Sequence, residues 1–363
     1  MKLKTSKWWM SLNLLALCFA FMAPSMAHYT HPAPTVPVKF PVRQEVLPNA
    51  LSVSIYLHKL PCTGGQSAWS YVTDGFSKFK QPELVMTIEK HATESESAYP
   101  SDPIEFFKSL LGLATQGNVI RAGGSTRLGE GADVFISKQF RGTIYLPAEK
   151  LEGVNLPKDA LAVVPVTTEE LDAWDIGGAA RVAGRLSQQS QFYPFPTWCD
   201  RSRESVFSQG EMQVMKIEPV SQAPTAMIYG AGIIADKDKL SMSVPQAVRD
   251  DLNQKLIELP KDTPFRLNLS LDPRANAYYV WEVQQATAVA AKGSDASLMS
   301  GSFVMVMPAM KTSQFGPYKD GFMLMLTNED LDKFKEAVSS GKDCVLESTT
   351  NGAYKTFEVK FSK

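Results

Sequence analysis

The four histidines are the first residues to consider, because imidazole binds metals and transfers protons near neutral pH. They are His28, His31, His58 and His91, and no HExxH string places two of them on one helical face. If the chain is cleaved after Ala27, the α-amino group and imidazole of His28 could hold one copper ion, completed by His31 or His58. A free N-terminal histidine is the alternative, and we predict no metal site.

Nucleophilic catalysis and phosphate binding also lack their usual patterns. No Gly-x-Ser-x-Gly string is present, and only His58 and His91 lie where they could serve a serine hydrolase as base. The glycine-rich segment 123–131 fits neither phosphate-binding motif, so we interpret it as tight turns. The sequence therefore predicts no catalytic residue and no cofactor. The alternative is a periplasmic hydrolase or metal-dependent enzyme without recognisable motifs.

Arginine and aromatic residues gather between positions 181 and 203. These residue types dominate the energetics of protein-binding surfaces. We therefore predict a protein-binding surface, and the alternative is a long connection held by its own aromatic side chains. The predicted surface consists of Trp69, Asp74, Arg185, Tyr193, Trp198 and Arg201.

Residues 1–27 have the features of a cleavable export signal. Three lysines precede an apolar run over 12–23, and Ser25 and Ala27 supply the small residues of a cleavage site. The run is too short to cross a bilayer as a helix, for which about 20 residues are needed. We expect cleavage after Ala27, a periplasmic or secreted protein, and no membrane span in the mature chain.

Three cysteines remain in the mature chain, namely Cys62, Cys199 and Cys344. Their wide spacing matches neither a CxxC pair nor a zinc knuckle. We interpret most or all of them as small buried side chains; the alternatives are one disulfide, which an oxidising compartment would allow, and a catalytic cysteine.

Charge argues against nucleic acid as a partner. The whole chain carries a formal net charge of −1, and residues 1–27 contribute three lysines and no acid, so the mature charge is −4. A mildly acidic chain offers no electrostatic reason to bind nucleic acid or an anionic membrane. The composition, with 44% hydrophobic and 21% charged residues, is that of a globular protein.

Hydrophobic periodicity predicts an α+β fold with two mixed sheet-and-helix halves and mainly antiparallel strands. The halves are expected at 45–207 and 208–363, after a proline-rich leader over 28–44. Similar strand-to-helix segments at 166–174 and 326–334 are consistent with a duplication or with cap chemistry alone. Expected strands include 51–57, 83–89, 181–186, 302–307 and 322–326, and expected helices are 103–114, 167–174, 244–259 and 327–338.

Segments in ordered succession resemble the C-terminal region of Smad anchor for receptor activation (SARA) and its relative endofin. They include Trp69-Ser-Tyr-Val-Thr-Asp-Gly-Phe, Arg181-Val-Ala-Gly-Arg-Leu, Tyr193-Pro-Phe-Pro and Thr327-Asn-Glu-Asp-Leu. In those animal proteins the region follows a FYVE zinc finger, which the three cysteines of this chain cannot build. The resemblance implies an α+β module that binds proteins rather than one that catalyses. We expect an exported, non-catalytic binding or scaffold protein whose partner is another protein.

Overall fold

The computed structural model describes residues 40–61, 64–129, 135–259, 262–349 and 352–362. The predicted export signal, nearly all of the proline-rich leader and Cys62 lie outside these ranges. The described chain contains 25% helix and 35% strand. The α+β prediction is confirmed, whereas the boundary at 207/208 stays a prediction.

The first sheet has eight strands in the order β1-β2-β3-β4-β7-β6-β5, with β8 added beside β4. All pairs are antiparallel except β4 with β7 and β4 with β8. Successive side chains of a strand point to opposite faces, so this sheet has two cores. Val163 packs with helix α1 (Asp102–Ala114) on one face, and Val164 packs with helix α2 (Thr168–Ser190) on the other. The strands are β1 (Val42–Leu47), β2 (Leu51–Lys59), β3 (Ser67–Asp74), β4 (Leu84–Glu89), β5 (Ser125–Arg127), β6 (Gly142–Pro147), β7 (Leu161–Val166) and β8 (Trp198–Cys199).

The second sheet has eleven strands, with the main order β13-β12-β14-β9-β11-β15-β17-β16. Strand β10 pairs with β9 and β19, and β18 pairs with β19. Leu252 of α5 (Gln246–Glu258) and Phe334 of α6 (Asn328–Ser340) belong to the core on one face. The strands are β9 (Thr225–Asp236), β10 (Lys239–Pro245), β11 (Phe265–Leu271), β12 (Ala277–Val280), β13 (Thr287–Ala290), β14 (Leu298–Ser300), β15 (Phe303–Met307), β16 (Gln314–Tyr318), β17 (Gly321–Met325), β18 (Cys344–Glu347) and β19 (Thr356–Ser362).

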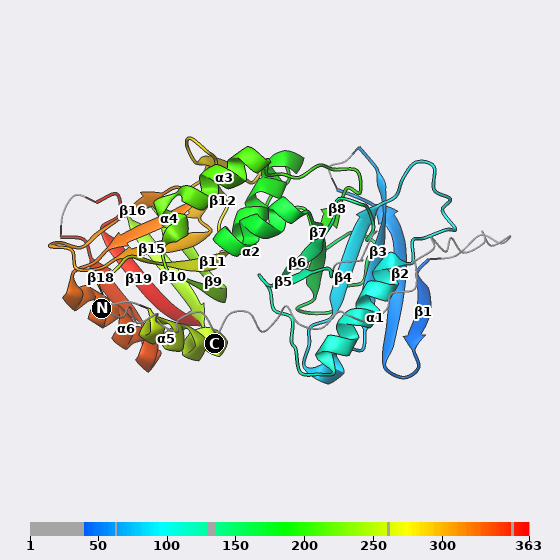
Figure 1. The fold of residues 1–363 in the computed structure, drawn as a ribbon, viewed down its shortest axis with the longest axis horizontal. Helices are drawn as coiled ribbons and strands as arrows, with labels where there is room; N and C mark the ends of the chain where they lie inside the picture. The colour runs from blue at the N-terminus through cyan, green and yellow to red at the C-terminus, as the bar shows by residue number, and fades with distance from the viewer. Residues whose placement is uncertain (1–39, 62–63, 130–134, 260–261, 350–351, 363) are drawn as a thin grey trace, which may run out of the picture.

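Helix α2 joins the two sheets, and Figure 1 shows it between them; α3 (Gln209–Ile217) packs against α2, and α4 (Pro219–Gln222) follows over the second sheet. It begins with the capping box expected from the sequence. The Thr167 hydroxyl accepts the Glu170 N–H at 3.3 Å, and the Glu170 carboxylate accepts the Thr167 N–H at 2.9 Å. Such a box satisfies two N–H groups that have no partner within the helix.

The predicted end of this helix and the strand over 181–186 are wrong. The backbone turns at Gly178 (φ 77°, ψ 177°), and helical geometry then resumes through Ser190. This conformation is essentially restricted to glycine. The Gly177-Gly178 pair therefore kinks α2 instead of ending it.

Candidate functional site

A largely apolar cavity lies where the two halves meet, and we call it the junction cavity. It has a volume of about 470 Å³, and apolar side chains form most of its wall. Its residues come from both sheets, from α2 and from the segment after α2. They are Ala122, Gly123, Leu146, Pro147, Glu149, Gly178, Ala179, Ala180, Ala183, Tyr193, Pro194, Phe195, Met227, Ile228, Tyr229, Gly230, Asn268, Leu269, Ser270, Leu271, Asp272, Pro273 and Tyr278.

An interruption in strand pairing shapes one wall of this cavity. Met227 of β9 pairs with Asn268 of β11, but Ser270 pairs with Gly232, so residues 228–231 of β9 lie opposite one residue of β11. Gly230 within this bulge has φ +82°, and its N–H donates to Ser270 Oγ at 3.2 Å. Bulges redirect side chains and leave part of a strand unpaired. Here the bulge brings Ile228, Tyr229 and Gly230 to the cavity.

Two tyrosines, Tyr193 and Tyr278, also line the cavity. The Tyr193 hydroxyl donates to the carbonyl oxygen of Ala275, and the Tyr278 hydroxyl donates to that of Pro194. Their rings lie 5.6 Å apart between centroids. Burial, with a further contribution from Asp272, raises the pKa of Tyr193 to about 12. Both phenols are therefore neutral hydrogen-bonding groups at physiological pH.

The charged lining of the junction cavity is entirely acidic. Glu149 and Asp272 are its ionisable carboxyl groups, and no lysine, arginine or histidine lines it. Burial raises the pKa of the Glu149 carboxyl, and no hydrogen bond or ion pair joins it to another described residue. Asp272 is paired with Arg274 at 2.6 Å. Glu149 is thus the carboxylate that a cationic ligand would find free.

Asn268 supplies a second free group. Asn268 is only 3% exposed, and its Nδ2 donates to the Ile176 carbonyl oxygen at 3.3 Å. Within the described ranges its Oδ1 has no hydrogen-bond partner. A buried acceptor without a partner costs free energy, and this oxygen has almost no surface that is accessible from the cavity.

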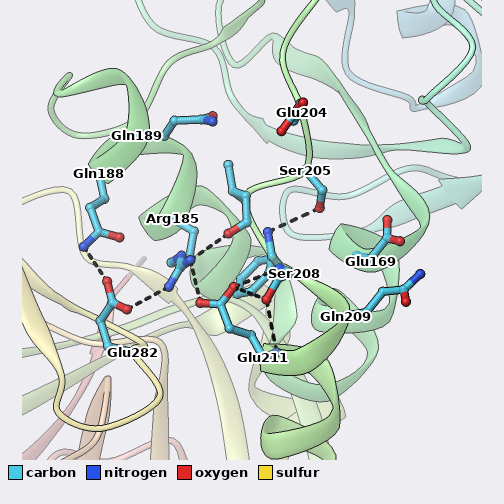
Figure 2. Close-up of a pocket in the computed structure, with 12 residues that line it drawn as sticks. Glu169, Arg185, Gln188, Gln189, Glu204, Ser205, Ser208, Gln209, Glu211 and Glu282 are labelled. Atoms are coloured by element: carbon cyan, nitrogen blue, oxygen red, sulfur yellow. Dashed lines mark hydrogen bonds and ion pairs between the residues drawn. The ribbon is translucent and has the colours of Figure 1, made fainter.

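A second, polar pocket of about 600 Å³ surrounds Arg185 (Figure 2). The Arg185 guanidinium lies 2.9 Å from Glu211 Oε1 and 3.0 Å from Glu282 Oε2, and it also donates to the Val206 carbonyl oxygen at 2.8 Å. Burial raises the pKa of the Glu211 carboxyl, but hydrogen bonds from Ser208 and Arg185 outweigh this effect and bring it below its ordinary value. Through these interactions Arg185 links α2 to α3 and to the segment that follows β12.

The six residues of the predicted binding surface do not share one exposed surface. Trp69 is 0% exposed and fills the core beneath α1, while Trp198 is buried against Phe192. Arg201, also buried, is paired with Glu94 at 2.6 Å. Asp74 is exposed and is paired with Arg43, Arg185 lies in the polar pocket, and Tyr193 lines the junction cavity.

The residues considered for catalysis lie away from both cavities. His58 Nε2 is 2.8 Å from Ser70 Oγ, and burial lowers the pKa of its imidazole. Neither His58 nor His91 lines either cavity. In the described part of the chain, no group of three or more histidine, cysteine or acidic residues could hold a metal ion. Cys199 and Cys344 are free thiols there.

Sequence reasoning missed Glu149, Asn268 and Asp272, because nothing in their local sequence marks them as neighbours. They come from the loop after β6, from β11 and from the residue that follows β11. One usable signal was the Gly177-Gly178 pair, since consecutive glycines within a helical pattern indicate a kink or a close approach. In the described ranges, no helix is long and apolar enough to cross a membrane.

Comparison with known proteins finds one sequence relative and several structures of low similarity. The chain is 20% identical over 296 residues to human zinc finger FYVE domain-containing protein 9, covering 77% of this chain. It spans about one fifth of that protein's length. Among solved structures, Drosophila Suppressor of Fused is 12% identical with a TM-score of 0.37, covering 86% of this chain and 89% of its own. A homologue from Neisseria gonorrhoeae is 18% identical with a TM-score of 0.31, covering 44% and 79%.

The family match covers the kinked part of α2 and nearly all of the second half. Residues 173–360, more than half of the sequence, match the family described as "Smad anchor for receptor activation-like, C-terminal". This confirms the resemblance inferred from the sequence. The chain belongs to the family of Smad anchor for receptor activation-like C-terminal regions.

Proposed function

We propose that this protein is a non-catalytic binding or scaffold protein that holds a segment of a partner protein in the junction cavity. The observation that carries the proposal is the lining of that cavity, which is mostly apolar and whose charged groups are all acidic. Membership of a family named after an anchor protein supports protein binding. Pockets at the junction of two structural units are common sites of recognition.

The lining also specifies the chemistry of the bound segment. Apolar walls favour an aliphatic or aromatic side chain, whose burial is worth about 25 cal/mol per Å² of apolar surface. The free Glu149 carboxylate favours a lysine or arginine beside it. We therefore propose a partner segment that carries a basic residue next to an apolar one.

Peptide selection followed by calorimetry tests this function. A displayed library of random peptides is selected on the purified full chain, and the winners are titrated against variants. Enrichment of basic residues adjacent to apolar residues is expected. Glu149→Gln should weaken binding about fivefold, the upper range for a partly screened ion pair. Glu152→Gln, an exposed acid three residues away, is the matched control and should change nothing.

A cavity-filling variant gives an independent readout. Ala183→Phe places a ring where apolar lining residues now leave space, and it should abolish binding of every selected peptide. Circular dichroism and thermal unfolding check that the variant still folds. Peptides that bind Ala183→Phe as tightly as the native protein would show that the junction cavity is not their site.

We also propose that the protein acts in the periplasm or outside the cell. The support is the charge, apolar run and small residues of 1–27, which have the pattern of a cleavable signal. Mass spectrometry of protein purified from its native host should give a mature N-terminus at His28. A chain that retains Met1 would contradict export by this signal.

A further inference from the structure

Two arginines meet in the interior at the kink of α2, apart from the lining of the junction cavity. Arg181 belongs to α2 and Arg266 to β11, and each is 1% exposed. The Arg266 guanidinium donates to the carbonyl oxygen of Ile176. The Arg181 guanidinium lies against Gly177, the residue after Ile176, because a Cβ at Gly177 would stand 2.8 Å from Arg181 Cζ.

The two guanidinium groups share an aromatic neighbour as well. Arg181 Cζ lies 5.8 Å, and Arg266 Cζ 5.9 Å, from the centroid of the Phe303 ring. Both groups thus converge on Ile176 and Gly177 and on one ring. Two like charges in the protein interior repel each other more strongly than in water, because the effective dielectric constant is lower there.

The acids nearby balance only one of these charges. Asp320 accepts from Arg181 Nε at 2.9 Å and Nη2 at 2.8 Å, and it also accepts the Ser302 hydroxyl at 2.5 Å. No described acidic residue is paired with Arg266. The cluster of Arg181, Arg266 and Asp320 therefore carries a net charge of +1 in the interior.

The cluster also has more hydrogen-bond donors than acceptors. Nε and Nη1 of Arg266 and Nη1 of Arg181 have no hydrogen-bond partner among the described residues. Guanidinium groups are donors only, and they do not lose their proton at neutral pH. Burial, and then repulsion by Arg181, lowers the pKa of Arg266 to about 9, which still leaves it charged. Buried charges in proteins are usually paired, and Arg266 has no such counter-charge among the described residues.

We propose that a small monovalent anion of the chloride class binds between the guanidinium groups of Arg181 and Arg266. It accepts N–H groups of Arg181 Nη1 and Arg266 Nη1, which have no other partner among the described residues, and neutralises the excess positive charge. A monovalent ion matches the net charge of +1, whereas a phosphate dianion would leave the cluster negative. The bound ion would hold β11 and the second segment of α2 together at the kink.

Thermal unfolding at constant ionic strength tests the site. Sodium gluconate, whose anion is much larger, is replaced stepwise by sodium chloride, and the full chain is compared with Arg266→Met. The native protein should gain about 3 °C in Tm once chloride reaches ten times its Kd. Arg266→Met should not respond, while Arg249→Met, a control on α5, should respond as the native chain does. An equal chloride response in Arg266→Met overturns the proposal.

Anomalous scattering from bromide-soaked crystals provides a test that needs no variant. Crystals of the native protein soaked in sodium bromide should show an anomalous peak within hydrogen-bonding distance of Arg181 Nη1 and Arg266 Nη1. If bromide peaks lie only at the surface, or if water occupies this position, the proposal is wrong. This result does not depend on peptide binding in the junction cavity, so the two proposals fail separately.

Discussion

Replacing Asp320 with Asn would test how strongly the two halves depend on the buried ion pair across their junction. Asp320 is 0% exposed and holds Arg181 through two hydrogen bonds of 2.9 and 2.8 Å. Asparagine has nearly the same shape but no charge. Asp320→Asn therefore leaves Arg181 and Arg266 in the interior without any acidic partner.

The expected loss is a large part of the total stability. Removing one partner of a buried ion pair costs about 3–5 kcal/mol, because the remaining charge stays desolvated. Asparagine can still accept one N–H of Arg181 through its Oδ1, so we expect about 3 kcal/mol. Typical proteins are stable by only about 5–15 kcal/mol.

Urea unfolding measured by tryptophan fluorescence is the appropriate assay. Trp281 lies 6.0 Å from Arg181 Cζ and reports directly on this region. Asp332→Asn, at an exposed position on α6, is the matched control and should change the free energy of unfolding by less than about 0.5 kcal/mol. The double variant Arg181→Met/Asp320→Leu should regain most of the loss, since it removes both charges. The reasoning is refuted if Asp320→Asn is as stable as the control.

Three further predictions concern the kink, one histidine and one cysteine. Gly178→Ala should cost about 1–3 kcal/mol in urea unfolding, because its φ of 77° with ψ of 177° is essentially restricted to glycine. Gly112→Ala, with no atom within 4 Å of its Cβ, should not destabilise, and equal losses would contradict this account of the kink. Burial lowers the pKa of His58 below 6.5, so the unfolded chain binds its proton more readily. The stability from neutral His58 is complete above pH 6.5 and is lost as the pH falls through the folded pKa. His58→Gln should flatten this part of the pH profile, and an unchanged profile argues against the assignment. Burial raises the pKa of the Cys199 thiol to about 12, so Cys199 should resist thiol reagents until urea unfolds the chain. Rapid labelling of Cys199 in native buffer, located by peptide mapping, would show that the site opens.

Local patterns predicted the elements that depend on local interactions. The alternation of Leu51, Val53 and Ile55 marks the buried face of β2, and all three residues are in the core. The capping residue Thr167 was identified because a threonine three positions before a glutamate is a signal within one helical turn. The family resemblance was also visible in the sequence, and the family match over residues 173–360 confirms it.

The sequence could not show where packing overrides a local signal. Arg181-Val-Ala-Gly-Arg-Leu was predicted as a strand, although Val182, Ala183 and Leu186 lie on one helical face and pack into the core of the first sheet. Two glycines before this segment are a reasonable end for an isolated helix. Contacts with β11 and β12 decide the outcome, and these strands are about 90 residues away in the chain.

The same limitation explains the predicted binding surface. Tryptophan and arginine are typical both of binding surfaces and of buried junctions, so residue type alone cannot separate the two. Trp69, Trp198 and Arg201 are all buried, and Arg201 forms an ion pair with Glu94. Tyr193 lines the junction cavity, but its partners there come from positions 122 to 278. No local window of the sequence contains that neighbourhood.

The carbonyl oxygen of Ile176 connects the junction cavity with the buried arginines. It accepts a hydrogen bond from Arg266 and another from Asn268, whose side chain also lines the cavity. Ile176 is the second residue before the kink, so the carbonyl that ends the first segment of α2 is held by two residues of β11. One carbonyl oxygen at the kink of α2 is thus held both by a residue that lines the cavity and by one of the two buried arginines.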